Sequence, residues 1–167
     1  MSDPSEPEEA DFDAARFRQV LGHFPTGVTV VTAMDDGEPA GLAVGSFASL
    51  SLDPPLVLFC AGTGSSTYPK IRDAGSFCVN ILSEDQEDIC RIFASKGGDR
   101  FQGIGWRKSG NGAPLLEGVL AFLDCDIVDE ITEGDHYVVV GRVTDLEVMH
   151  EGGPLLFFRG GYGRFQL

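Results

Sequence analysis

Short apolar runs separated by turn residues predict a chain built mainly of β-strands. The runs are rich in β-branched and aromatic residues, and several of them alternate with polar positions. Strands are expected at residues 26–33, 39–47, 56–61, 76–82, 118–128, 136–148 and 154–158. Because most of these strands are short and two adjoin tight turns, Asp35-Asp36-Gly37 and Glu133-Gly134-Asp135, an antiparallel barrel is favoured over a parallel α/β sheet.

Three short helices are expected among these strands. The first begins near residue 11, where apolar side chains recur at helical spacing on one face: Phe17, Val20, Leu21 and Phe24. The second spans residues 68–74, with Ser66 or Thr67 as its N-cap. The third follows Ser83 and Gln86, which have the spacing of a capping box, and should end at about Ser95.

Length and charge restrict the kinds of partner. The 167 residues suit one domain, and no apolar run is long enough to span a bilayer. Residues 1–13 carry six acids and no base, so residues 1–10 are expected to form a disordered tail before a single domain, residues 11–167. Without those six acids the net charge of −14 becomes −8, which still argues against nucleic acid or a membrane as partner. The acidic N-terminus has no signal-peptide core, so the protein is expected to be cytoplasmic.

Neither the cysteines nor the histidines indicate a metal site. The four cysteines, at positions 60, 78, 90 and 125, are widely spaced without a CxxC motif. Cys60, Cys78 and Cys125 follow or lie within apolar runs, so they are expected to be small buried side chains in a reducing compartment. No histidine lies near a plausible nucleophile or metal set. His136 is the candidate of interest, because a hairpin turn places it at the rim of the predicted barrel, although a lone histidine at a rim is more often structural or solvated than functional.

Two stretches indicate a small-molecule cleft. Residues 41–55, GLAVGSFASLSLDPP, place glycine, alanine and serine where a core strand would carry bulky side chains, which allows a flat or phosphorylated ligand to approach the backbone. An ordinary strand followed by a polar turn would show a similar composition. Residues 96–112 form the most basic segment of an acidic chain, with four bases against Asp99, and would attract an anionic ligand: Lys96, Arg100, Arg107 and Lys108.

Six motifs in order then carry a resemblance to a known family. They read FxxxxGxFPTGVTVVTA, GLAVGSFASLSLDPPLVLF, SSTYPKIRDAGSFCVNIL, FASKGGDRF, GDHYVVVGRV and PLLFFRGGYGRF, and they cover about residues 12–165. The chain resembles the flavin reductase domain family, the small reductase components of two-component flavin-dependent monooxygenases. The resemblance implies an FMN-binding split β-barrel, usually a homodimer with a flavin cleft partly formed at the subunit interface, and hydride transfer from NADH or NADPH to FMN or FAD. NADH is expected rather than NADPH, because no arginine pair in this acidic chain is obviously reserved for a 2′-phosphate. The reduced flavin would pass to a separate oxygenase component.

The resemblance also implies roles for particular residues. Ala43, Val44, Gly45 and Ser46 would line the edge of the isoalloxazine ring, and Phe47 and Ser49 would shape the path of the ribityl chain. Ser66 and Thr67 would bind the flavin phosphate through hydroxyls and free N–H groups at the helix start. Three residues would close the other side of the flavin: Phe93, Ala94 and Lys96. The nicotinamide side would be bordered by Thr26, Gly27, His136, Arg159, Gly160, Gly161 and Tyr162, with His136 positioning the nicotinamide rather than acting as an obligatory acid.

The chain departs from the family pattern at three positions. The family often reads GLTANSFTSVS where this chain has GLAVGSFASLS, so Ala43, Gly45 and Ala48 lack polar groups that are frequent there. Ser46 and Ser49 would then supply more of the polar contacts. Two alternatives therefore remain beside the reductase: a non-catalytic flavin-binding or electron-carrier protein on the same barrel, and a dimeric interaction module that has lost flavin binding.

Overall fold

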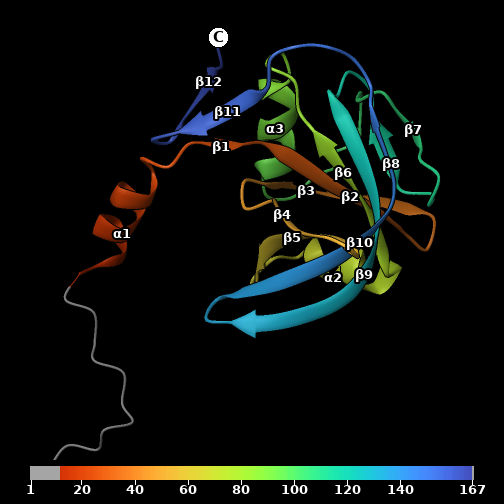
Figure 1. The fold of residues 1–167 in the computed structure, drawn as a ribbon, viewed down its shortest axis with the longest axis horizontal. Coiled ribbons are helices and arrows are strands. Elements are labelled where there is room, and N and C mark those ends of the chain that lie inside the picture. The colour runs from red at the N-terminus through yellow and green to blue at the C-terminus, as the bar shows by residue number, and fades with distance from the viewer. Residues whose placement is uncertain (1–11, 167) are drawn as a thin grey trace, which may run out of the picture.

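Seven antiparallel strands form the main sheet of the computed structural model, which describes residues 12–166. Their order is β3 (Glu38–Val44), β2 (Thr29–Asp35), β6 (Ser76–Ile81), β9 (Ala121–Glu133), β10 (His136–Val148), β5 (Pro55–Gly62) and β4 (Ala48–Leu52). The edge strands β3 and β4 are not paired with each other, so the barrel is split rather than closed. Figure 1 shows the long β9–β10 hairpin extending beyond the other strands. The predicted mainly β, split-barrel architecture with three short helices is confirmed.

Two small sheets complete the fold. Strands β1 (Thr26–Gly27), β11 (Leu155–Phe158) and β12 (Gly161–Arg164) form one, and β7 (Trp106–Lys108) pairs with β8 (Pro114–Leu116) in the other. The sequence pattern did not predict β7, β8 or β12 because these strands lie in or beside glycine-rich segments, where hydrogen bonds from the partner strand rather than residue propensity select the extended backbone. The expected acidic tail, residues 1–10, lies outside the described residues.

The expected strand 39–47 is wrong at its end. Strand β3 stops at Val44, and Gly45, Ser46 and Phe47 form a bend that leads into β4, which pairs with β5. This bend joins the two edges of the split barrel. Of the small residues that made the stretch unusual in the sequence, Gly45 and Ser46 therefore lie at the opening of the barrel, whereas those before and after the bend are paired in β3 and β4.

The three helices occupy different surroundings. Helix α1 (Ala14–Leu21) begins at Asp13, whose carboxylate accepts a hydrogen bond from the Arg16 N–H at 2.8 Å. Its expected apolar face is not covered within the chain, because the four side chains that define it are 51–73% exposed. Figure 1 shows α1 standing apart from the barrel. Helices α2 (Tyr68–Ala74) and α3 (Glu87–Ala94) instead pack on the main sheet.

Buried apolar residues cover both faces of the main sheet. One cluster joins α2 to the sheet through Phe59, Phe77 and Ile71, and the other joins α3 and β8 to it through Val30 and Phe93. Alternate residues of β2 enter the two clusters, as expected for a strand covered on both sides. The two helices are thereby fixed on either side of β3, the strand that the candidate site follows.

Three of the four cysteines are buried, Cys60 is half-buried although it was expected to be buried, and all four are free thiols. Burial raises the pKa of the Cys125 thiol to about 12, so this side chain behaves as an apolar one. No group of metal-ligating side chains occurs within residues 12–166. Over the same residues, none of the helices has the length and apolar character needed to cross a membrane.

Candidate functional site

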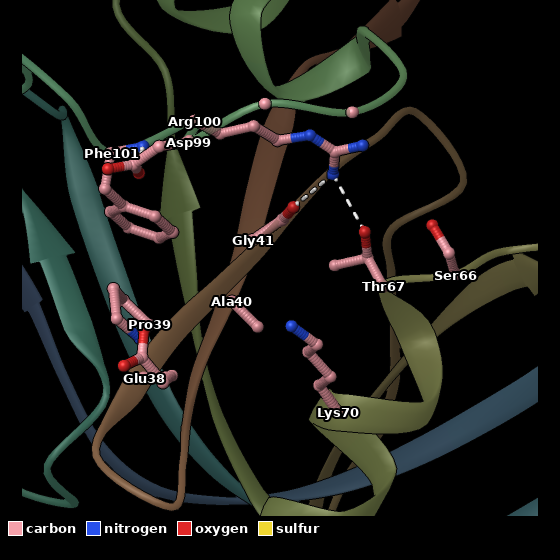
Figure 2. Close-up of a pocket in the computed structure, with 12 residues that line it drawn as sticks. Glu38, Pro39, Ala40, Gly41, Ser66, Thr67, Lys70, Asp99, Arg100 and Phe101 are labelled. Carbon is pink, nitrogen blue, oxygen red and sulfur yellow. Dashed lines mark hydrogen bonds between the residues drawn. The ribbon is translucent and has the colours of Figure 1, made fainter.

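A cleft of about 550 Å³ opens between β3, the start of α2 and the loop after α3. We call it the Arg100 cleft; its walls carry Glu38, Ser66, Thr67, Lys70, Arg100 and Phe101. Figure 2 shows Arg100 and Thr67 facing each other across one part of it, Lys70 pointing into it from α2, and Glu38 on the opposite side. Positive and hydroxyl groups thus gather on the α2 side of the cleft.

Arg100 is held in place by three acceptors within the chain. Its Nη1 donates to the Gly41 carbonyl at 2.8 Å and to the Thr67 hydroxyl at 2.9 Å, and its Nη2 donates to the Ser95 carbonyl at 2.5 Å. The guanidinium has five N–H donors in a rigid fork, so donors remain for an anion. Lys70 makes no ion pair within residues 12–166. The two side chains together place positive charge in the cleft, with the Arg100 guanidinium held in position by the chain.

The start of α2 differs from the expectation of free N–H groups. Ser65, which the sequence reading did not consider, accepts hydrogen bonds from the N–H groups of Thr67 at 3.2 Å and Tyr68 at 3.1 Å. The side chain of Thr67 makes no cap bond and instead accepts from Arg100. Because that oxygen is an acceptor toward Arg100, its own hydrogen remains available to a ligand. An anion here would therefore be bound by side chains rather than by the helix backbone.

Gly41 makes the floor of the Arg100 cleft. A Cβ at this position would lie 2.8 Å from Cδ1 and closer still to Cε1 of Phe93, whose side chain is 1% exposed. Phe93 also meets Phe101 edge to face at 5.0 Å. Of the three residues expected to close the other side of the flavin, Phe93 therefore supports the cleft from below, whereas Ala94 and Lys96 are exposed at the end of α3.

A second cleft of about 460 Å³, the Gly45 cleft, lies at the other end of β3. It brings together five of the expected site residues: Thr26, Gly27, Gly45, Ser46 and Phe47. Two others occupy less open positions, since Ala43 is half-buried and Val44 is buried. Ser49 is exposed on β4.

Ser46 has a structural partner that the sequence did not reveal. Its hydroxyl donates to the Cys60 carbonyl at 3.2 Å and accepts from the Cys60 N–H at 2.9 Å. These bonds fasten the bend to β5. The hydroxyl is therefore already engaged, and the backbone of the bend, not the side chain of Ser46, is the polar surface that it offers to a ligand.

The small sheet of β1, β11 and β12 gathers most of the expected nicotinamide side. Thr26 and Gly27 pair with Phe157 and Leu156, and Arg159 and Gly160 form the turn between β11 and β12. Tyr162 in β12 contacts the Cys90 thiol of α3 at 3.3 Å. That contact, with partial burial, raises the pKa of Tyr162 to about 12.

His136 lies apart from these residues within one chain. It begins β10 opposite Gly62, is exposed, and its Nδ1 is 2.6 Å from Oδ1 of Asp135. The hydrogen bond with His136 lowers the pKa of the Asp135 carboxyl. Figure 1 places the start of β10, at the tip of the long hairpin, and the β11–β12 ribbon at opposite ends of the molecule.

A polar cluster fastens α2 to the long hairpin. Glu130 of β9 accepts two hydrogen bonds from Arg72, at 2.8 and 2.9 Å, and one from the hydroxyl of Tyr68. The Arg72 guanidinium also lies over the Tyr68 and Tyr137 rings, 4.9 and 4.5 Å from their centroids. This cluster fixes the direction of α2, and with it the position of Thr67 and Lys70 in the Arg100 cleft.

Sequence reasoning found the hydroxyls of the Arg100 cleft but not its two cations. The basic segment 96–112 was recognised as attractive to an anion, yet nothing in the pattern distinguished Arg100 from Lys96, Arg107 or Lys108. Only the fold shows that Arg100 turns toward Thr67. Lys70 gave no signal, because a lysine on a short helix is ordinarily a solvated residue.

Comparisons with known proteins agree with this architecture. The family model described as "Flavin reductase like domain" matches residues 21–166. A flavin reductase of Pseudomonas putida is 54% identical over 154 residues, which cover 92% of this chain and 91% of the relative. The reductase subunit of a flavin-dependent monooxygenase from Rhodococcus jostii is 50% identical over 150 residues, covering 90% of this chain and 77% of the relative.

Solved structures share the fold. An NADH:FAD oxidoreductase of Streptomyces globisporus, solved in complex with NAD and FAD fragments, superposes with a TM-score of 0.88 at 37% identity and covers 92% of this chain and 93% of its own. The fold and the two clefts define a split-barrel protein with a cleft that carries Arg100 and Lys70 and with an open bend at Gly45. The chain belongs to the flavin reductase-like domain family, and the enzyme class expected from the sequence, an NAD(P)H-dependent flavin reductase, is confirmed.

Proposed function

We propose that the protein binds FMN or FAD along β3 and transfers a hydride to it from NADH, supplying reduced flavin to a separate monooxygenase. The observation that carries the proposal is the alignment of the two clefts. Gly41 beside Arg100 and Gly45 at the bend are four residues apart, about 13 Å along a strand. A phosphate at one point and an isoalloxazine ring at the other would connect through the ribityl chain.

The Arg100 cleft fits the phosphate end of a flavin. Arg100 and Lys70 supply positive charge, and Ser66 and Thr67 supply hydroxyl donors. These groups compensate for the acidic balance of the chain, which would otherwise repel a phosphate.

The bend fits the ring end. Gly45 has no side chain to cover its backbone, and Ala43 and Ala48 on either side are small, so the edge of a flat ring can approach the peptide groups. When bound, flavin supplies the acceptor for a hydride from nicotinamide C4, and the protein contributes geometry and exclusion of water. Because the hydride passes directly from nicotinamide to flavin, the site needs no paired acidic and basic catalytic side chains.

We also propose that the working form is a homodimer. Apolar side chains of α1 are exposed, and further exposed ones follow on β4 and the long hairpin: Leu50, Leu52, Val128, Ile131, Leu146 and Val148. This much exposed apolar surface is characteristic of an interface. Because the tip of the hairpin is remote from β11–β12 within one chain, a second copy is also the means by which His136 could reach a nicotinamide at Thr26 and Gly27.

NADH is favoured over NADPH. In this acidic chain no pair of arginines is obviously reserved for the 2′-phosphate of NADPH. The separate oxygenase follows from relatives such as the Rhodococcus jostii subunit. A cytoplasmic location remains a prediction.

The first test is NADH oxidation by the purified protein with and without added FMN or FAD. The proposal expects turnover that depends on added flavin, and faster turnover with NADH than with NADPH. Flavin that survives dialysis together with no oxidation of either nicotinamide would contradict the proposal and favour the carrier alternative. The absence of any flavin-induced rise in Tm would favour the interaction module.

A further inference from the structure

We infer that His150 is a pH-sensitive clamp, which in its doubly protonated form joins the turn at Gly118 to the connection between β10 and β11. The clamp holds the start of the β11–β12 ribbon, which pairs with β1 beside the Gly45 cleft. The inference goes beyond the proposed function and does not depend on where a flavin or a nicotinamide binds.

Both ring nitrogens of His150 face backbone carbonyls. Nδ1 lies 2.9 Å from the Glu151 carbonyl oxygen, and Nε2 lies 3.0 Å from that of Gly118. A carbonyl oxygen can only accept, so both nitrogens must donate if both bonds are to form, and only the imidazolium carries two N–H groups. A neutral ring donates to one carbonyl and turns a lone pair toward the other. The geometry therefore selects the charged form of the ring.

Two glycines shape the place where the ring lies. A Cβ on Gly152 would be 3.3 Å from Cε1 and 3.4 Å from Nδ1 of the His150 ring, so a side chain there would press on the ring. Gly118 has a φ of 79°, in the left-handed region that favours glycine, and the turn that presents its carbonyl depends on this conformation. Both acceptors and the space between them are thus provided by the backbone.

Charged side chains of both signs surround the ring. A cavity of about 250 Å³ beside it is lined by Arg107 of β7 and by Glu117, and Glu151 follows the histidine in sequence. The bonds to the Glu151 and Gly118 carbonyls raise the pKa of His150 above the ordinary histidine value of about 6.5. The clamp is therefore complete below that ordinary value, and it loses one bond as the pH rises through the raised pKa.

An uncharged side chain holds the same turn from its other side. Gln86, which precedes α3, donates from Nε2 to the Glu117 carbonyl at 2.8 Å. Neighbouring carbonyls of one turn are thus bound by an amide, which does not titrate, and by the His150 ring, which does. A change of pH therefore alters the attachment of the turn to the β10–β11 connection and leaves its attachment to α3 as it is.

The first measurement is a titration of the ring nitrogens by NMR on the ¹⁵N-labelled full chain, with the His150 signals assigned by their loss in His150→Ala. Both nitrogens should be protonated at pH 6, and the midpoint should lie above 6.5. Glu151→Gln keeps both carbonyls, so the midpoint should stay raised in that variant.

Thermal melts and amide exchange then test what the clamp holds. His150 is exposed, so His150→Ala is expected to fold, with a Tm a few degrees below that of the wild type at pH 6 and a smaller deficit at pH 9. The matched control Gln86→Ala should show the same deficit at both pH values. The Leu155 N–H at the start of β11, which donates to the Leu82 carbonyl at 3.1 Å, should exchange faster in His150→Ala than in the wild type at pH 6.

A midpoint at or below 6.5, a single ring proton at pH 6, or a His150→Ala deficit that is equal at pH 6 and pH 9 would overturn the inference. So would a midpoint that returned to the ordinary value in Glu151→Gln, since the side-chain charge rather than the carbonyls would then hold the proton. Unchanged exchange of the Leu155 N–H at pH 6 would refute the link to β11. None of these measurements uses a flavin or a nicotinamide, so they leave the proposed function untouched, which fails only if neither flavin supports NADH oxidation.

Discussion

Removing the guanidinium of Arg100 is the sharpest test of the proposed phosphate site. Arg100→Ala would delete the cation that faces Thr67 across the cleft, together with its bonds to the Gly41 and Ser95 carbonyls. A hydrogen bond to a charged group contributes about 1.5–3 kcal/mol, and each 1.4 kcal/mol is about a factor of ten. The KM for flavin should therefore rise by about 10- to 150-fold, with a smaller change in kcat.

The assay is steady-state NADH oxidation at varied flavin concentration. Arg107→Ala is the matched control, because it removes the same charge from the same basic segment but lies outside the Arg100 cleft. It should change the flavin KM less than about twofold, as surface charges are screened by salt. A circular dichroism melt of both variants separates lost binding from lost folding. Equal KM values for the two folded variants would refute the phosphate position.

Three further predictions concern the surroundings of the cleft. Gly41→Ala should lower the free energy of unfolding by about 1–3 kcal/mol, because the new methyl group overlaps Phe93. The control Gly64→Ala, whose methyl group would meet open space, should leave that free energy unchanged, and thermal melts compare the two variants. Thr67→Val keeps the shape but removes the hydroxyl, and should raise the flavin KM by about tenfold; an unchanged KM would exclude that contact. Burial alone would raise the pKa of the Glu130 carboxyl, but hydrogen bonds from Arg72 and the Tyr68 hydroxyl lower it. The ionised carboxylate therefore stabilises the folded protein above the ordinary glutamate pKa, and this contribution is lost as the pH falls through the lowered pKa. Glu130→Gln should thus lower Tm by a few degrees at pH 7, and a difference that persisted undiminished at pH 3 would contradict this reasoning.

The sequence pattern predicted correctly those elements that are determined by neighbouring residues in the chain. Helix α2 has the expected bounds because Pro69 and Gly75 mark its start and end. The resemblance to the family likewise followed from several ordered motifs. The predicted strand through Phe47 failed because its hydrophobic pattern continues past the point where pairing stops, and pairing depends on β5, which is distant in sequence.

The site could be predicted only in part, for a similar reason. Ser66 and Thr67 were identified by their place before a helix, but the cap itself is formed by Ser65, and that depends on the path of the preceding turn. Arg100 is 33 residues from Thr67 in sequence, so only tertiary structure relates them. Phe93 was assigned to the flavin, yet it lies under Gly41, because the helix turns that side chain toward the core.

The bonds of Arg100 have a consequence for how fast a product can leave. Three of its donor contacts are made to the chain itself, at Gly41, Thr67 and Ser95. Departure of a flavin therefore does not leave the guanidinium without acceptors, and the cleft need not rearrange before the next molecule arrives. A protein that hands its product to another enzyme gains from this arrangement, since tight capture and quick release are usually opposed. We therefore expect the loop between α3 and β7 to keep these Arg100 contacts whether or not a flavin is bound.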